Sequence, residues 1–312
     1  MLQYLIILLD DTSVSFCHYE NTKTERKLIS LENLKKGILF AMKQNLMIQF
    51  VFPACELPEE YKSVIETIDN HKIMPQNANT ENADVVIFDN VNENDFSLFS
   101  EKSVVLRLSK ADFFTKTEKI CSLIGKTARL NIVFTDIETF TEKDFELYKT
   151  KLEILKNAVK EISLKDKFPQ FNLLTDRVLL DKMNNCNAGI ENITLAPNGK
   201  FYICPAFYFE NESDFVGDLQ NGIEIKNKQL LKFEYAPICR KCDAFQCKRC
   251  VWLNRKTTKE VNTPSREQCV TAHLERNASR DLLLDLQEHS AFLDKSIKEI
   301  DYLDPFDVVE KF

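Results

Sequence analysis

The segment CRKCDAFQCKRC, residues 239–250, places four cysteines within twelve positions. They form two Cys-x-x-Cys pairs, a spacing that lets both sulfurs of a pair face one metal while backbone N–H groups point at them. Four thiolates would bind zinc in a tetrahedral site, but the pairs of zinc ribbons usually stand about 15–20 residues apart. Here only four residues separate the pairs. We therefore consider both zinc and an iron–sulfur centre.

Three further cysteines, Cys186, Cys204 and Cys269, lie nearby, so seven of the ten cysteines fall within 84 residues. Seven thiols divide into four for one centre and three for another. A three-cysteine iron–sulfur centre leaves one iron for another ligand, a substrate or solvent. The N-terminus has no basic region or cleavage site typical of export, so we expect a cytoplasmic protein, in which clustered thiols indicate metal binding or catalysis.

Basic residues are interleaved with these cysteines, although the whole chain has a formal net charge of −7. Between residues 239 and 259 only Asp243 is acidic, and the basic residues are Arg240, Lys241, Lys248, Arg249, Arg255, Lys256 and Lys259. Such cations would stabilise an anionic iron–sulfur core, and the alternative is a solvated basic loop that binds nothing. The acidic balance gives no general attraction to nucleic acid or to an anionic membrane, and no apolar run approaches the length of a membrane span.

The elements that must position these residues change character near residue 180. Before it, continuous apolar runs predict strands at 4–9, 47–52, 85–88, 104–108 and 132–134, and helical patterns lie at 58–68, 112–124, after Ser30 and after Thr141. The helix after Thr141 carries Phe145, Tyr148, Leu152, Leu155, Val159 and Ile162 on one face. Repeated strand–helix units of this kind predict a parallel sheet or partial barrel with helices outside.

The second part of the chain shows different signals. Asn198-Gly199 between strand-like residues 193–196 and 201–203 predicts a β-hairpin. A helix is expected after Cys269, through Leu274, Ala278, Leu282 and Leu286. We expect an α/β domain over residues 1–177, a cysteine-rich domain over 178–280, and a helix end and surface tail over 281–312.

The order of the seven cysteines resembles the SPASM domain, the iron–sulfur extension of many radical SAM enzymes that modify peptides or proteins. Cys186, Gly199 and Cys204 match the first half of its motif, and the 239–250 block with Cys269 matches the second. The block is one residue shorter than the family pattern in each of its last two spacings. FVGDLQNGIEI, residues 215–225, also looks like the connecting stretch of that domain.

This resemblance implies two auxiliary [4Fe-4S] clusters with crossed ligands, zinc being the alternative. Cys186, Cys204 and Cys250 would serve the first cluster, and Cys239, Cys242, Cys247 and Cys269 the second. Family members with a complete first site have one more cysteine just upstream, whereas residues 180–185 of this chain contain none. The fourth ligand of the first cluster stays open.

Radical SAM enzymes also place three cysteines after the first strand of a partial (β/α) barrel. In this chain that stretch is DDTSVSFCHYEN, residues 10–21, where Asp10, Val14 and Cys17 stand at the three positions. One thiolate cannot hold the cluster that binds S-adenosylmethionine. We therefore expect no S-adenosylmethionine cluster, no autonomous radical SAM activity, and a degenerate partial barrel as the front domain.

The combination resembles the CXXX repeat peptide maturases. It implies a part in maturing a ribosomally made precursor peptide with Cys-rich repeats, beside a radical SAM partner that performs the radical step. The competing class is a non-catalytic peptide-binding or adaptor module that is stabilised by iron–sulfur clusters or zinc.

Other residues with chemical potential have simpler explanations. Cys17, Cys55 and Cys121 are expected to be buried small apolar residues. Four aspartates stand near predicted strand ends, where α/β active sites cluster, but helix capping explains most such residues; they are Asp10, Asp89, Asp136 and Asp176. His273 follows Cys269 by four residues and could complete a site, although a surface histidine is the first expectation.

Overall fold

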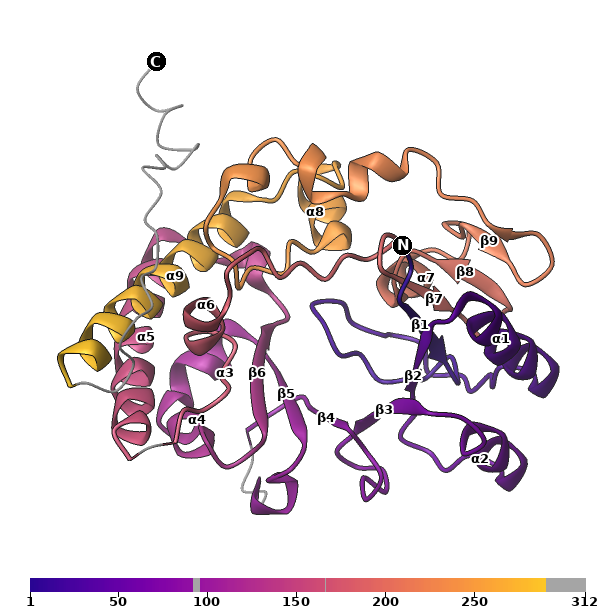
Figure 1. The fold of residues 1–312 in the computed structure, drawn as a ribbon, viewed down its shortest axis with the longest axis horizontal. Coiled ribbons are helices and arrows are strands. Elements are labelled where there is room, and N and C mark those ends of the chain that lie inside the picture. Colours follow the sequence, from indigo (N-terminus) through magenta and orange to yellow (C-terminus); the bar gives the residue numbers. More distant parts are fainter. Residues whose placement is uncertain (92–95, 166, 290–312) are drawn as a thin grey trace. The chain divides into compact units, whose positions relative to one another are not determined.

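The computed structural model describes residues 1–91, 96–165 and 167–289, which form two compact units (Figure 1). The first unit contains Met1–Phe88 and Asn187–Lys232, and the second contains Asp89–Cys186 and Phe233–Phe312 as far as these are described. Each unit thus combines two distant chain segments. The domain boundaries expected from the sequence were placed where the pattern of apolar residues and cysteines changes, whereas these units are defined by spatial compactness. The expected boundaries stay predictions.

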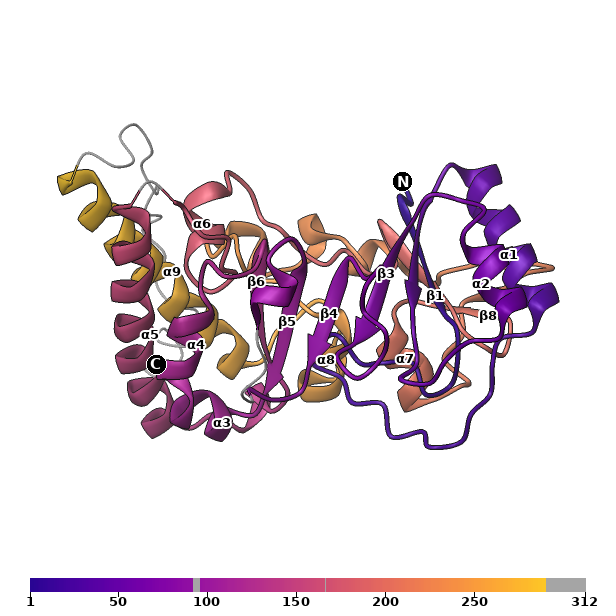
Figure 2. The same ribbon diagram turned by 90° about the horizontal axis from the view of Figure 1, so that it is seen from below.

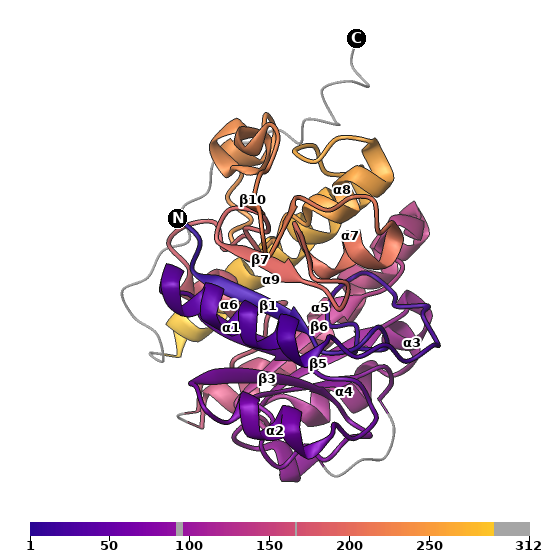
Figure 3. The same ribbon diagram turned by 90° about the vertical axis from the view of Figure 1, so that its right-hand side faces the viewer.

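The first unit is built on a mostly parallel sheet. Its parallel strands are β1 (Tyr4–Leu8), β2 (Met47–Val51), β3 (Asn70–Pro75), β4 (Val85–Phe88) and, on the other side of β1, β7 (Asn192–Leu195). The helices α1 (Leu31–Gln44) and α2 (Glu59–Ile65) connect β1 to β2 and β2 to β3, and they lie on the same face of the strands (Figures 1 and 3). Residues 5–8 are all buried, as expected for a parallel strand covered on both faces. The predicted parallel sheet is confirmed.

The sheet continues beyond β7 in antiparallel order through β8 (Lys200–Tyr202), β9 (Gly217–Asp218) and β10 (Gly222–Ile223). The predicted β-hairpin is therefore confirmed as β7 and β8. Gly199 turns it with a φ of +77°, in the left-handed region that favours glycine. After the hairpin come α7 (Pro205–Glu210) and the 3₁₀ turn η3 (Lys228–Leu231).

The second unit packs helices around two parallel strands, β5 (Ser103–Leu108) and β6 (Arg129–Phe134). Its helices are α3 (Lys110–Thr115), α4 (Thr117–Leu123), α5 (Glu142–Ser163), α6 (Thr175–Leu179), α8 (Val251–Thr258) and α9 (Arg266–Glu288), with 3₁₀ turns η1 (Phe96–Phe99), η2 (Ile137–Thr139), η4 (Phe233–Tyr235) and η5 (Cys239–Lys241). The long helices α5 and α9 pack along each other (Figure 2). Thr141 and Asp144 form a capping box at the start of α5, as the cap signal predicted.

Three elements differ from expectation. The single helix predicted at 112–124 is divided into α3 and α4 at Lys116, where φ is −108°. Next to the break the Thr117 hydroxyl donates to the carbonyl of Phe113 at 2.8 Å, a back-bond that bends helices. Strand β3 was not predicted, because NHKIMP lacks a continuous apolar run and is held by pairing with strands on both sides. Helix α9 begins before Cys269, where Ser265 accepts from the Gln268 N–H at 3.4 Å.

The predicted tail extends beyond residue 289 and there lies outside the described residues. Among the helices that the structure describes, none combines the length and apolar character that a membrane span requires.

Candidate metal centre

Four cysteines surround one small cavity in the second unit. The cavity has a volume of about 30 Å³ and is lined by the side chains of Cys239, Cys242, Cys247, Cys269 and His273, with Arg249 and Gln268 beside them. These are the four thiols that the family resemblance assigns to the second cluster. Their role as ligands stays a prediction, but the fold brings them to one place.

The backbone between residues 239 and 247 turns twice to achieve this. The N–H of Cys242 donates to the carbonyl of Cys239 at 2.9 Å, and the N–H of Cys247 donates to the carbonyl of Ala244 at 2.9 Å. The N–H of Ala244 also points at the Cys242 sulfur, 3.4 Å away. This is the arrangement expected of a chelating Cys-x-x-Cys turn. Cys269 reaches the cavity from the first turn of α9.

His273 lies one helical turn beyond Cys269 and faces the same cavity. Its Nε2 atom is 3.5 Å from the Cys242 sulfur. The side chain is half-buried, so it differs from the surface histidine that the sequence favoured.

Burial makes these thiols poor acids in the absence of a bound cation. It raises the pKa of Cys239 to about 11, against the opposing charge of Arg249, and raises the pKa of Cys247 to about 12. The pKa of Cys242 is also raised by burial, while the Ala244 N–H and the charge of Arg276 oppose the change. A metal ion would supply the missing positive charge, because a coordinating thiol is deprotonated.

Cations from two distant elements stand near this segment. Arg276 on α9 donates to Asp243 at 2.7 Å, and the guanidinium of Arg177 on α6 lies 4.3 Å from the ring centre of Phe245. Sequence reasoning missed both because it considered only the basic residues interleaved with the cysteines. Arg276 was detectable in principle, since it follows Cys269 by seven residues and therefore shares its helical face.

Some of the basic residues interleaved with the cysteines lie where they could compensate thiolate charge, and the others are solvated. Arg249 is buried, with 4% of its surface exposed, and it lines the cavity. Lys248 and Arg255 are half-buried, whereas the exposed members are Arg240, Lys241, Lys256 and Lys259. Only part of the basic segment is therefore placed to compensate thiolate charge, and the rest forms a solvated surface.

The donor set fits a soft metal centre. Four sulfurs and an imidazole are the ligands that zinc and iron–sulfur clusters use. Within residues 1–91, 96–165 and 167–289, no three His, Cys, Asp or Glu side chains have the geometry to hold a metal ion. The sulfurs thus line the cavity without converging on a common point.

The three cysteines assigned to the first cluster are distributed over both units. The N–H of Cys186 donates to the carbonyl of Lys248 at 3.0 Å, which places it beside the cysteine-rich block. Cys250 caps α8, and its sulfur accepts from the Leu253 N–H at 3.5 Å. Cys204 belongs to the first unit, immediately before α7. Their common ligation stays a prediction.

The loop after β1 in the first unit is held by polar contacts. Asp10 is fully buried, and its Oδ1 accepts from the backbone N–H and the hydroxyl of Thr12 at 2.8 and 2.5 Å. The Ser13 hydroxyl donates to the carbonyl of Val51 at 2.9 Å, and Asp11 accepts from the hydroxyl of Tyr208. Cys17, in the same loop, is half-buried. Carboxylate and hydroxyl groups therefore organise this end of β1.

The other residues singled out from the sequence have structural roles. Asp136 accepts from the N–H of Lys110 at the start of α3, whereas Asp89 and Asp176 form ion pairs with Arg107 and Arg129 rather than helix caps. The expectation that Cys17, Cys55 and Cys121 are buried is wrong, since all three are half-buried. Burial nevertheless raises the pKa of Cys121 to about 11.

Comparison with solved structures bears on the fold. A structure of histidine-tagged anSMEcpe with bound AdoMet matches with a TM-score of 0.63 and 14% identity, covering 93% of this chain and 100% of that chain. Native anSMEcpe with bound AdoMet and Cp18Cys peptide matches with a TM-score of 0.64 and 14% identity, covering 92% and 99%. The likeness establishes the fold. The mixed α/β class expected from the sequence is confirmed, and the finer description as a degenerate barrel with a SPASM domain stays a prediction.

Streptococcus suis SuiB bound to precursor peptide SuiA matches with a TM-score of 0.47 and 13% identity, covering 86% of this chain and 76% of that chain. No protein-family model matches the sequence. No curated protein matches it either.

Proposed function

We propose that this chain is an iron–sulfur protein that takes part in the post-translational maturation of a ribosomally made, Cys-rich repeat peptide. The observation that carries the proposal is the cavity shared by Cys239, Cys242, Cys247 and Cys269. The fold is consistent with it, because native anSMEcpe, a solved structure of similar fold, holds AdoMet together with a peptide.

The cysteines are proposed to hold two centres. Cys239, Cys242, Cys247 and Cys269 would hold one, and Cys186, Cys204 and Cys250 the other. When bound, an iron–sulfur cluster supplies one-electron transfer or an iron that can ligate a substrate thiol. Three arginines would lower the energetic cost of the thiolate charge. Arg249 opposes the rise in the pKa of Cys239, and Arg276 and Arg177 oppose the rise in the pKa of Cys242.

We propose that the radical step belongs to a partner protein. In the segment after β1 only Cys17 is a thiol, and the two other positions of the radical SAM pattern are occupied by Asp10 and Val14. The carboxylate of Asp10 is engaged by Thr12. A radical SAM partner would activate the precursor peptide, and this chain would bind it or pass electrons.

Iron analysis of anaerobically purified protein tests the proposal. Two centres predict brown protein with about eight iron atoms and matching acid-labile sulfide per chain. Cys239→Ala and Cys242→Ala should each lower the iron content by about half, whereas Cys121→Ala, a half-buried thiol outside the cavity, should leave it unchanged. Colourless protein with one zinc per chain would overturn it.

A second candidate is a zinc-stabilised peptide-binding or adaptor module without redox chemistry. It is favoured by the imidazole of His273, whose Nε2 atom lies 3.5 Å from the Cys242 sulfur. Zinc takes four sulfur and nitrogen donors in a closed site of this kind. The same metal analysis separates the two functions, because zinc gives neither visible colour nor labile sulfide.

A further inference from the structure

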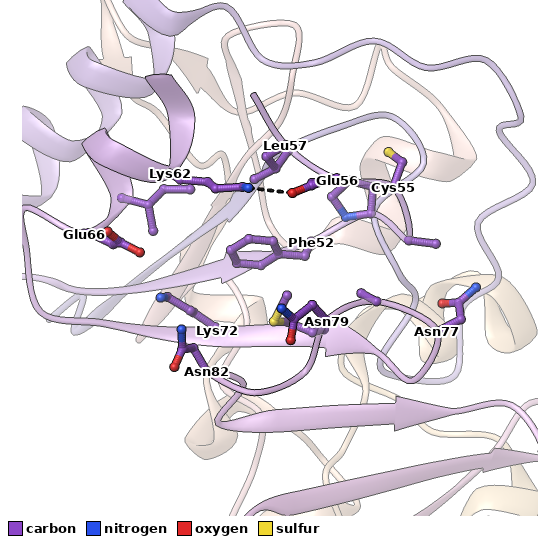
Figure 4. Close-up of a pocket in the computed structure, with 15 residues that line it drawn as sticks. Phe52, Cys55, Glu56, Leu57, Lys62, Glu66, Lys72, Asn77, Asn79 and Asn82 are labelled. Atoms are coloured by element: carbon purple, nitrogen blue, oxygen red, sulfur yellow. Dashed lines mark hydrogen bonds and ion pairs between the residues drawn. The ribbon is translucent and has the colours of Figure 1, made fainter. Parts of the chain in front are cut away.

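A groove in the first unit lies apart from the cysteines. It has a volume of about 460 Å³, within the range of about 300–1,000 Å³ typical of ligand sites. Its walls come from the segment after β2, from α2, from β3 and from residues 76–84, and the ring of Phe52 lies at its centre (Figure 4). All of these elements belong to one unit.

The groove exists because one crossover lacks a helix. Parallel strands are usually joined by a helix that covers the sheet, as α1 and α2 do here. Residues 76–84, which join β3 to β4, contain no helix. The apolar face beside α2 is therefore left as a floor formed by Phe52, Leu57, Ile65 and Met74, which are 9%, 5%, 2% and 9% exposed.

Side-chain amides stand along the rim of this floor. Asn77, Asn79 and Asn82 all line the groove and are labelled in Figure 4. Their loop is fixed by backbone hydrogen bonds, in which Ala78 donates to Pro75 at 3.1 Å and Ala83 donates to Thr80 at 3.0 Å. Within the described part of the chain, the side chains of Asn77 and Asn82 are exposed and make no hydrogen bond with the protein. An ordered loop thus presents two solvated amides to the groove.

The charges at the groove balance. Lys62 and Lys72 are matched by Glu56 and Glu66. The ammonium of Lys62 is already engaged, since it lies 2.7 Å from Glu56 and 2.8 Å from Glu59. A phosphate-bearing or strongly charged ligand gains no net attraction here. The groove therefore suits an uncharged ligand with an apolar group and several amide-type partners.

We propose that this groove binds an extended, uncharged peptide segment. Each asparagine side chain offers one acceptor and two donors, which match the N–H and C=O of a peptide group. The amides of Asn77 and Asn82 would pair with the peptide backbone, while one apolar side chain packs on Phe52 and Met74. Because the backbone is recognised, binding tolerates changes of sequence. The inference rests on the proposed function and adds where the precursor peptide is held.

The test uses a fluorescein-labelled synthetic peptide of Ser-x-x-x repeats with a central leucine. Serine replaces every cysteine, so the probe cannot bind through iron. Fluorescence anisotropy with the full-length, anaerobically purified protein should show saturable binding. Asn77→Ala and Asn82→Ala should each weaken it about fivefold, the net worth of one hydrogen bond. Gln44→Ala removes an exposed amide from α1 and serves as the matched control without effect.

A second probe carries N-methyl groups on the backbone amides around its leucine and should bind at least about fivefold more weakly. The inference is overturned if the first probe fails to bind, if both asparagine variants bind it as the wild type does, or if N-methylation has no effect. Displacement by maltose would assign the groove to carbohydrate and overturn it as well. Iron analysis of the same samples distinguishes the two hypotheses. If the protein contains iron but does not bind the peptide, only the peptide-binding inference is contradicted. If the protein binds the peptide but contains no iron, only the iron–sulfur function is contradicted.

Discussion

Glu275 on α9 is a half-buried acid whose protonation the structure links to stability. Its Oε1 accepts from the hydroxyl of Tyr148 at 2.8 Å, and its Oε2 accepts from Nε2 of Gln246 at 3.4 Å. Burial raises the pKa of this carboxyl from its ordinary value of 4.5 to about 7, and the two hydrogen bonds only partly oppose it. Ionised Glu275 is therefore unfavourable in the folded protein.

The sign of the pH effect follows from proton binding. Between pH 4.5 and about 7 the folded protein holds a proton on Glu275 that the unfolded chain has released, so the free energy of unfolding falls as pH rises through this window. Below the window there is no cost, and above it the cost is constant. The difference between about 7 and 4.5, at about 1.4 kcal/mol per pH unit, gives at most about 3.5 kcal/mol. Because the residue is half-buried rather than fully buried, solvent screening reduces this cost to about 3 kcal/mol or less.

Replacing the acid by its amide removes this cost. Glu275→Gln keeps an acceptor for Tyr148, and its new N–H can donate to Oε1 of Gln246, which has no hydrogen-bond partner among the described residues. We expect the variant to match the wild type at pH 5, where the wild-type carboxyl is largely protonated, and to be more stable by up to about 3 kcal/mol at pH 8.

The assay is thermal unfolding without oxygen, at one scan rate and with matched metal content. A gain of about 3 kcal/mol corresponds to a rise in midpoint of about 6–10 °C for a protein of this size. Glu288→Gln, at an exposed position of the same helix, is the control and should show no gain that depends on pH. A midpoint difference between Glu275→Gln and the wild type that is equal at pH 5 and pH 8 would refute the reasoning.

Two further predictions concern the cation near the cysteines and the loop after β1. Arg276→Met leaves Asp243, which is 5% exposed, without its ion-pair partner, and should lower stability by about 3–5 kcal/mol, measured by the same thermal assay; an unchanged midpoint would contradict this. Reconstituted protein incubated with S-adenosylmethionine and dithionite should form no 5′-deoxyadenosine, because the segment after β1 offers only Cys17 as a thiol. Turnover that survives Cys17→Ala and replacement of the cysteines in the C-terminal half would show that the front domain was misinterpreted.

Local sequence signals predicted the elements whose stability is local. The caps at Ser30 and Thr141 and the apolar periodicity after them correctly placed α1 and α5. Strand β3 could not be predicted in this way, because its polar residues form a strand only between β2 and β4. The groove beside α2 depends on the same tertiary context, since it arises from a crossover without a helix.

The residues of the candidate metal centre also differ in whether local sequence signals could identify them. Cys239, Cys242 and Cys247 were identifiable from spacing alone, because nearby turns bring them together. Cys269 was assigned to this centre only through the family resemblance, and it comes from another element, α9. Arg177 could not be identified from the sequence, because its position above the ring of Phe245 depends on how α6 packs.

The central claim is that the cysteines hold two iron–sulfur centres, divided between Cys247 and Cys250. The most direct measurement is the electron paramagnetic resonance spectrum of reduced, anaerobically reconstituted Cys247→Ala and Cys250→Ala, compared with the wild type. The account predicts about eight iron atoms in the wild type and a different signal lost in each variant. If both substitutions alter one and the same signal, and the wild-type iron never exceeds about four atoms per chain, the block holds a single centre and the account is contradicted.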